Sequence, residues 1–468
     1  MGSARKDQRP AELDRNKACS GRTFLNEFTL SRGKREVNSI QHLRREDIPL
    51  LGNLAVQQYR LANGLQIAVV VDKTTPIFTY QTWFKVGSAD EPAGRQGLAH
   101  LFEHMMFRKT ATRAMGEFER IVNNNGGTGI NAYTSRDQTV YFFTFPNDKV
   151  DLAADLESDR MANLVVDTEM FETEKGAVLT EKNRGLDDPN RLLWETMYSL
   201  AYTEHNYRYS TIGEIESIKN FSVDEARKFY ANNYSPNNSL IIVAGDVEPD
   251  SVVRIVDEKY GALKPAVPDK RAVTAEPVQR EPRSSVITHS KATRRLLAKS
   301  WHVPNMLHPD YPALAVIGKL LTSGKSAVLN ERLLNTAKAT EVFSDAYVSR
   351  DMGTFELYVQ CADGEPFESV EQIFLSCVNE FAEGKISDGQ MQIVRNNLQR
   401  ELYRAVTVPA QLARLLGDGF INTGDLSFQI KAMKRIEAVD KDDIQRAAAK
   451  YLLEGKSTTV QLIPEKKV

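Results

Sequence analysis

The chain has 468 residues, a length that corresponds to two to four domains at roughly 100 to 200 residues each. Apolar residues make up 41% and charged residues 26%, which is close to ordinary soluble domains and excludes wholesale disorder. The 60 basic and 62 acidic side chains give a net charge of −2. Because this balance provides no sustained basic field, nucleic acid is not expected as a partner.

Cysteine content and hydropathy exclude further classes. The three cysteines, Cys19, Cys361 and Cys377, form no C-x-x-C spacing, so neither a disulfide framework nor a thiolate metal site is predicted. No segment approaches the roughly 18 consecutive apolar residues of a membrane span, and residues 1–50 lack the apolar core of a signal peptide. We therefore expect a soluble protein, cytoplasmic on this sequence or periplasmic if a leader has been removed.

Composition changes along the chain predict its domain organisation. Residues 1–49 contain eleven Lys or Arg and seven Asp or Glu with little periodicity, which indicates a basic, loosely ordered extension. A catalytic domain is expected over 50–263 and a second domain over 285–468. Between them, residues 264–284 contain four prolines and many charges, as is typical of a linker.

The first of these domains begins with β-rich segments. Residues 54–71 predict two short strands around the Asn63-Gly64 turn, and another strand is expected at 78–86. Apolar residues at helical spacing then predict a mostly buried helix over 97–108. The elements expected after it are a hairpin at 129–145 turning at Ser135-Arg136-Asp137, helices at 150–164, 168–185 and 223–234, the last with Ser222 as its N-cap, and a buried strand at 239–244.

The second half shows a similar order of elements. Strands are expected at 285–290 and 296–303, a helix at 311–321, and a closing strand at 458–463. Strands followed by helices and a returning strand favour an α+β fold, with helices packed on a mixed or antiparallel sheet. The likeness between the two halves suggests an internal duplication.

A cluster of polar residues interrupts the predicted helix at 97–108. His100 and His104 are four residues apart, which places both imidazoles on one helical face as a bidentate metal clamp. Glu103 lies beside His104, where it can reach a metal-bound water as general base without being a ligand. The order H-x-x-E-H is the known inverted zincin pattern. The alternative is a chance grouping on a helix.

A catalytic zinc needs a third protein ligand. Glu181 on the predicted helix 168–185 is the best donor, and Glu174 lies two turns earlier on the same face. Glu174 could orient a ligand or the water network from the second coordination shell. The alternative is that Glu172, Glu174 and Glu181 form a solvated helix face.

The chain resembles the pitrilysin and insulinase family of metallopeptidases, which includes the mitochondrial processing peptidases and smaller bacterial members. The resemblance is carried by residues 97–104, by Asn131-Ala-Tyr-Thr-Ser-Arg136, and by Glu174 with Glu181. It implies Zn²⁺ as the cofactor, with Glu181 as third ligand beside His100 and His104. It also implies two homologous α+β halves that face each other across a chamber for an unfolded peptide.

The segment 129–134 has a substrate-binding interpretation that agrees with this resemblance. A peptidase must hold an extended chain beside its metal, and an exposed sheet edge does so through main-chain hydrogen bonds. Asn131 and Ala132 are expected against the substrate backbone, with Tyr133 in the same substrate-binding strand. The alternative is an ordinary hairpin strand with Tyr133 in the core.

The second half departs from the family pattern. Active single-chain members carry an Arg and a Tyr there that stabilise the reacting carbonyl, whereas this chain has Val328 at the matching Arg position and Ala339-Thr340-Glu341-Val342 around the Tyr position. Arg332, Tyr347 and Arg350 are nearby substitutes. If the pair is missing, the resemblance predicts a heterodimer with a related subunit that lacks the zinc motif and supplies the Arg and Tyr.

These observations together predict a zinc-dependent endopeptidase that hydrolyses extended or unfolded peptides. Zinc would lower the pKa of its water, and Glu103 would take the proton and pass it to the leaving amine. One alternative is a catalytically silent scaffold or peptide-binding subunit of the same fold. Another is a non-haem iron oxygenase, since two His and one carboxylate also form that triad. The additional Glu103 favours hydrolysis.

Overall fold

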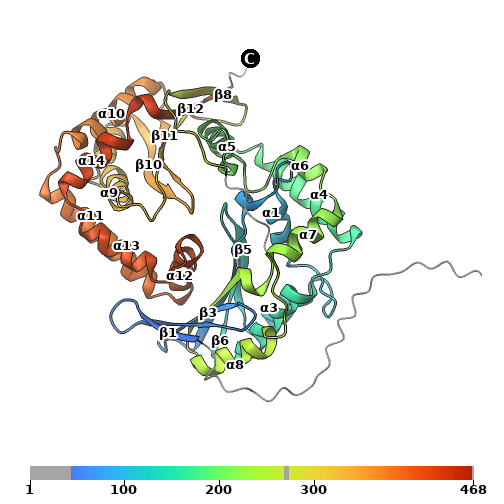
Figure 1. Cartoon of the computed structure of the whole chain (residues 1–468). Helices are drawn as coiled ribbons and strands as arrows, with labels where there is room; N and C mark the ends of the chain where they lie inside the picture. Colours follow the sequence, from blue (N-terminus) through green and yellow to red (C-terminus); the bar gives the residue numbers. More distant parts are fainter. Residues whose placement is uncertain (1–43, 268–273, 466–468) are drawn as a thin grey trace, which may run out of the picture. The chain divides into compact units, whose positions relative to one another are not determined.

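The computed structural model describes residues 44–267 and 274–465, and their strands form two β-sheets (Figure 1). The first sheet has the strand order β1-β2-β3-β7-β4-β6-β5, and the second has the order β10-β11-β9-β12-β8. The strand bounds are β1 Arg44–Pro49, β2 Ala55–Arg60, β3 Gln66–Val71, β4 Ile77–Phe84, β5 Thr128–Thr134, β6 Thr139–Pro146, β7 Ser239–Gly245, β8 Arg283–His289, β9 Leu296–Val303, β10 Ala339–Val348, β11 Gly353–Cys361 and β12 Ser457–Pro464.

Helices cover the faces of both sheets. Among the described residues, no helix is both long enough and apolar enough to cross a bilayer. The helix bounds are α1 Leu98–Met105, α2 Glu117–Asn124, α3 Val150–Asn163, α4 Thr168–Gly185, α5 Pro189–Ala201, α6 Ile215–Lys219, α7 Val223–Asn233, α8 Pro249–Tyr260, α9 Tyr311–Thr322, α10 Phe367–Ala382, α11 Asp388–Val406, α12 Pro409–Thr423, α13 Phe428–Glu437 and α14 Lys441–Tyr451.

The two sheets share one topology. In the first, β7 pairs parallel with β3 and antiparallel with β4; in the second, β12 pairs parallel with β8 and antiparallel with β9. The order β3-β7-β4-β6-β5 therefore repeats as β8-β12-β9-β11-β10, and the first sheet adds β1 and β2 at one edge. The predicted α+β fold with mixed sheets is confirmed, and the repeated topology supports an internal duplication.

The predicted extension 1–49 needs a correction at its end. Arg44–Pro49 forms β1, which pairs antiparallel with β2 from Arg44↔Arg60 to Pro49↔Ala55. Ile48 lies opposite the buried Val56 and packs against the same core, which gives this polar segment its anchor. Residues 1–43 lie outside the described residues, as do 268–273 of the predicted linker. At the other end of that linker, β8 begins at Arg283 and so includes the last two residues of the predicted linker, 283 and 284.

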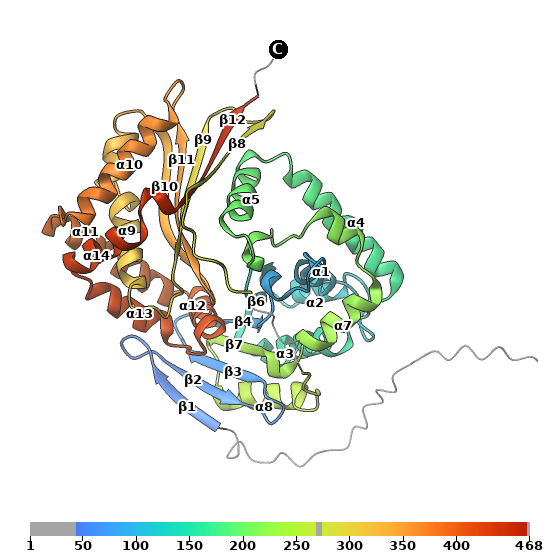
Figure 2. The same cartoon turned by 45° about the horizontal axis from the view of Figure 1, so that its top comes forward.

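One helix from each half of the chain packs against the sheet of the other half (Figures 1 and 2). Leu193 and Met197 of α5 pack with apolar side chains of β9 and β12 in the second sheet. Leu412 and Leu416 of α12 pack in return with side chains of β7 in the first sheet. The proposed boundary between 50–263 and 285–468 therefore separates two stretches of sequence, but residues from both halves pack together in shared cores.

Helix α12 packs closely against the first sheet. Gln81 of β4 donates from Nε2 to the carbonyl oxygen of Ala410 at 2.9 Å, and the buried indole of Trp83 lies under the middle of the helix. A Cβ atom added to Gly417 would come within 2.2 Å of Trp83 Cε2. Glycine is therefore required at this position for close packing.

We predict opposite effects of alanine at two helical glycines. Gly417→Ala should lower the free energy of unfolding by about 1–3 kcal/mol, because the added methyl group overlaps the Trp83 ring. Gly176→Ala in α4 should raise it by about 0.5–1 kcal/mol, because nothing lies within 4 Å of the added atom and alanine favours the helix. Urea unfolding followed by circular dichroism measures both. A Gly417→Ala protein as stable as the Gly176→Ala protein would contradict the described packing.

Candidate active site

Helix α1 is fixed at its N-terminus by a buried carboxylate. Glu91 Oε2 accepts from the backbone N–H of Gly97, and Oε1 accepts from that of Ala99, both at 2.8 Å. These are N–H groups of the first turn, which have no partner within the helix. Burial raises the pKa of Glu91 well above its ordinary value, and the two N–H donors oppose this shift. Gly97 has φ 109°, and a Cβ there would meet Ile212 O at 2.6 Å.

The apolar side of α1 is inserted into the core of the first half. Leu98, Leu101, Phe102 and Met105 are buried there, and Tyr141 of β6 donates from its hydroxyl to the carbonyl oxygen of Phe102 at 3.0 Å. This packing leaves the other face of the helix, with His100, Glu103 and His104, directed towards α4 and β5.

The structure brings the three predicted metal ligands together. His104 Nε2 lies 3.3 Å from Glu181 Oε2, and His100 Nε2 lies 3.8 Å from Glu181 Oε1. One ligand atom from each of the three residues lies within 4.8 Å of the others. Because zinc ligand bonds of roughly 2.0–2.2 Å in a tetrahedral site separate the donor atoms by about 3.3 Å, this donor set fits zinc.

The protonation of His100 also suits metal binding. Burial, the neighbouring His104 and then Arg191 lower the pKa of His100 to about 3. His100 is therefore neutral at physiological pH and offers a free lone pair to a cation.

Glu174 lies behind His104 rather than among the ligands. It is buried, and its carboxylate forms a two-point ion pair with Arg108, at 2.7 Å from Nε to Oε1 and 3.0 Å from Nη2 to Oε2. Its Oε2 atom is 3.8 Å from His104 Nδ1. Glu172, by contrast, pairs with Lys175 on an exposed part of α4. The solvated-face interpretation thus describes Glu172, whereas Glu174 and Glu181 face α1.

Glu103 is held by a residue that the sequence analysis did not single out. Thr134, the last residue of β5, donates from Oγ1 to Glu103 Oε2 at 2.6 Å. Burial raises the pKa of Glu103, and the Thr134 hydrogen bond partly opposes this. The sequence feature that could have indicated this role is a hydroxyl side chain at the end of the strand that was expected to bind substrate beside the metal.

Strand β5 lies at the end of the first sheet, and in the described part of the chain no strand pairs with its outer edge. Asn131 is exposed, and its Oδ1 accepts from the backbone N–H of Ala132 at 2.9 Å. The Ala132 side chain is buried in the first core. Tyr133 packs edge-on to Trp83 and under the guanidinium of Arg414, so its partly buried side chain joins β5 to α12.

A cavity of about 520 Å³ adjoins the ligand cluster. His100, Glu181 and Thr134 form part of its wall, together with residues of α5 and of the segment that follows it. This contribution was not predicted, because α5 was not among the helices expected from the sequence. The other lining residues are Ser135, Arg136, Arg191, Trp194, Glu195, Tyr198, Tyr209, Ser210, Thr211 and Ile212.

In the second half, Val328 at the expected Arg position and the two substitute arginines, Arg332 and Arg350, all have other contacts. Val328 is buried in the second core. Arg332 forms a two-point ion pair with Glu380 at 2.9 and 2.7 Å. Arg350 pairs with two carboxylates of the first half, whereas the side chain of Tyr347 is half exposed.

Comparison with known proteins identifies the family of the chain. The model of the insulinase family (peptidase family M16) matches residues 66–214, and that of the peptidase M16 inactive domain matches 220–398. Zinc protease PqqE of Helicobacter pylori is 28% identical over 414 residues, which cover 86% of this chain and 92% of that protein. The mitochondrial-processing peptidase subunit beta of Blastocladiella emersonii is 23% identical over 440 residues, covering 92% and 94%.

A solved structure gives the same result. The crystal structure of a protease from Helicobacter pylori superposes with a TM-score of 0.82 and 26% identity, covering 90% of this chain and all of that one. Two matched family models and similarity along nearly the whole length lead to one conclusion. The chain belongs to the insulinase family of metallopeptidases, peptidase family M16.

Proposed function

We propose that this protein is a zinc-dependent endopeptidase that cleaves extended or unfolded peptides. The observation that carries the proposal is the convergence of His100, His104 and Glu181 beside a fourth group, Glu103, that is close to the cluster and held separately by Thr134. A structural ion-pair cluster does not require such a group. Hydrolysis does, because a proton must be moved. A facial triad for iron would need only the first three residues.

Each group has a distinct role in the proposed reaction. A zinc ion held by His100, His104 and Glu181 would polarise the scissile carbonyl and lower the pKa of the attacking water. Glu103 accepts the proton of that water and donates it to the leaving amine. Thr134 fixes the Glu103 carboxylate by a hydrogen bond from its hydroxyl to Oε2 at 2.6 Å.

The substrate is proposed to bind as an additional strand on β5. The outer edge of β5 ends at Thr134, so a peptide paired along Asn131 and Ala132 would pass directly beside Glu103. Main-chain pairing tolerates many sequences, while the adjoining cavity can accept one side chain next to the scissile bond. This arrangement suits unfolded chains better than compact domains.

A related second subunit is proposed to complete the site. Val328 is buried, Arg332 is paired with Glu380 and Arg350 is paired across the halves, so no arginine considered in the second half is free for the reacting carbonyl. One relative is named as a subunit of the mitochondrial processing peptidase, which supports an arrangement of two related chains. The partner would supply the Arg and Tyr.

The first prediction of the proposed function concerns Glu103→Gln. Because Glu103 is proposed as the base and not a ligand, this variant should keep one zinc per chain while peptide hydrolysis falls by about a hundredfold to ten-thousandfold. Metal analysis of protein prepared without chelator and a fluorogenic peptide assay measure the two effects. Loss of zinc together with activity would show that Glu103 is a ligand. Stoichiometric iron in the wild-type protein would instead favour the oxygenase alternative.

The second prediction concerns Glu181→Gln, with Glu172→Gln as the matched control on the same helix. The neutral amide is a weaker ligand, so Glu181→Gln should weaken zinc affinity by at least about tenfold. Glu172→Gln should leave the affinity unchanged, since Glu172 pairs with Lys175 on the surface. Competition with a chromogenic zinc chelator measures both. Equal zinc affinity in the two variants would contradict the ligand role of Glu181.

The third prediction is that the chain alone is slow. Loss of one carbonyl-stabilising donor costs about a hundredfold to a thousandfold in rate, so activity should rise by that factor when a related chain carrying the Arg and Tyr is added. Fast turnover by the purified single chain, proportional to its concentration, would rule out the need for a partner. Peptide binding without cleavage in any mixture would favour the second candidate, a silent peptide-binding subunit.

A further inference from the structure

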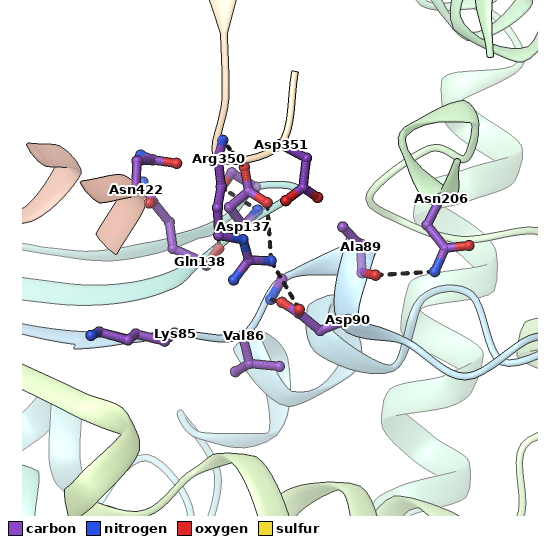
Figure 3. A network of polar contacts seen from close by, with 12 residues as sticks. Lys85, Val86, Ala89, Asp90, Asp137, Gln138, Asn206, Arg350, Asp351 and Asn422 are labelled. Atoms are coloured by element: carbon purple, nitrogen blue, oxygen red, sulfur yellow. Dashed lines mark hydrogen bonds and ion pairs between the residues drawn. The ribbon is translucent and has the colours of Figure 1, made fainter. Parts of the chain in front are cut away.

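Arg350 joins the second half of the chain to two acidic residues of the first half (Figure 3). It lies in the short loop between β10 and β11. Its Nη2 atom is 2.9 Å from Asp90 Oδ1 and 3.2 Å from Asp137 Oδ1, and its backbone N–H donates to Asp137 Oδ2 at 3.2 Å. The side chains are largely shielded from water, with exposed fractions of 22% for Arg350, 12% for Asp90 and 4% for Asp137.

The next residue reinforces this contact. Asp351 Oδ2 lies 3.0 Å from His205 Nε2, and the Asp351 N–H donates to the hydroxyl of Tyr207 at 3.4 Å. That hydroxyl donates in turn to Asp137 at 2.8 Å. The loop therefore presents one cation to a group of carboxylates, and Arg350 offsets the repulsion between Asp90 and Asp137.

Asp90 is linked to helix α1 through the residue that follows it, Glu91. It ends the short helix η2 Ser88–Asp90, and the following residue is Glu91, whose carboxylate accepts from the N–H groups of Gly97 and Ala99. A shift of Asp90 would therefore be passed by one peptide unit to the group that anchors the first turn of α1.

Asp137 is linked to helix α1 through the β5–β6 turn and Thr134. It lies in the β5–β6 turn, three residues after Thr134, whose hydroxyl holds Glu103. The turn and η2 are also bonded to each other, because Ser88 N–H donates to Ser135 O at 3.1 Å and Ala89 N–H donates to Arg136 O at 2.9 Å. The Arg350 guanidinium therefore contacts both segments that position Glu103, which are η2 through Asp90 and the β5–β6 turn through Asp137.

We propose that Arg350 is a positioning residue for peptide hydrolysis. Through Asp90 and Asp137 it sets the placement of η2 and of the β5–β6 turn, and thereby the orientation of Glu103. The second half of the chain acts on the reaction through this ion pair, without touching the substrate. The inference rests on the proposed function and adds to it a residue outside the metal-binding half.

The kinetic test compares Arg350→Gln with Arg446→Gln. Arg446 is the matched control, because it also bridges two carboxylates, Asp310 at 3.2 Å and Asp443 at 2.9 Å, but both belong to the second half. Arg350→Gln should lower kcat by about 10- to 100-fold, as expected for a misplaced catalytic group, with KM and zinc content nearly unchanged. Arg446→Gln should leave kcat unchanged, and Arg350→Lys should restore part of the rate.

A double-mutant cycle separates positioning from direct contact with the reacting carbonyl. If Arg350 acts through Asp90, Asp90→Asn should lower kcat as well, and the double variant Arg350→Gln/Asp90→Asn should be no slower than Arg350→Gln alone. Normal kcat values for both Asp90→Asn and Asp137→Asn together with a slow Arg350→Gln would show that Arg350 does not act through these carboxylates, and the proposal would be wrong.

Hydrogen exchange provides a measurement that does not depend on activity. In Arg350→Gln, backbone amides within 87–105 and 128–138 should exchange faster than in the wild type, whereas Arg446→Gln should leave both segments unchanged. Wild-type protein that cleaves no peptide with any partner would overturn the proposed function and leave this measurement to decide the structural link. Unchanged exchange in both segments would overturn the role of Arg350.

Discussion

The anchoring of helix α1 is the constraint on which the rest of the site depends. Its apolar residues are inserted into the first core, and the buried Glu91 carboxylate fixes its first turn. The rotation of the helix about its axis is therefore set by packing and not by the metal ligands. His100, Glu103 and His104 occupy the face that remains, so the placement of these three side chains follows from the packing of the helix.

The second helix of the site, α4, presents one exposed and one buried carboxylate to α1. Glu181 is about half exposed, as an open coordination site requires, whereas Glu174 seven residues earlier is buried. A buried carboxylate is costly unless it is paired, and the two-point contact with Arg108 provides the pairing. Arg108 follows shortly after α1 in the chain. This ion pair therefore also ties α4 to α1 at a distance suited to a shared ligand set.

The two halves depend on each other more closely than a duplicated sequence suggests. They exchange helices α5 and α12, and α5 forms one wall of the cavity beside the ligands. The second half has the same strand order as the first, yet α9, which follows its second strand as α1 follows β4, is almost wholly apolar. The two halves thus share a strand order but differ in the helix that carries the candidate site, and the contact of Arg350 with Asp90 and Asp137 joins them.

Much of the site could be predicted from the sequence, because its parts are local or carry short motifs. The spacing of His100 and His104 determines a shared helical face, and strand and turn patterns located the hairpin around Ser135-Arg136-Asp137, observed as β5 and β6. The pairing of β1 was not predicted, because its polar residues are held only by a partner strand and the contact at Ile48.

What only the tertiary structure decided involves residues far apart in the chain. Thr134 reaches Glu103 across 31 positions, and Arg350 reaches Asp90 across 260. No local periodicity encodes such contacts, since they depend on how strands are ordered and which helix crosses to the other sheet. The sequence by itself indicated the candidate metal-binding and proton-transfer groups, because they share a short motif or a helical face. The fold determined which side chains hold those groups in place, because an ion pair or a hydrogen bond forms only once packing has brought its partners within reach.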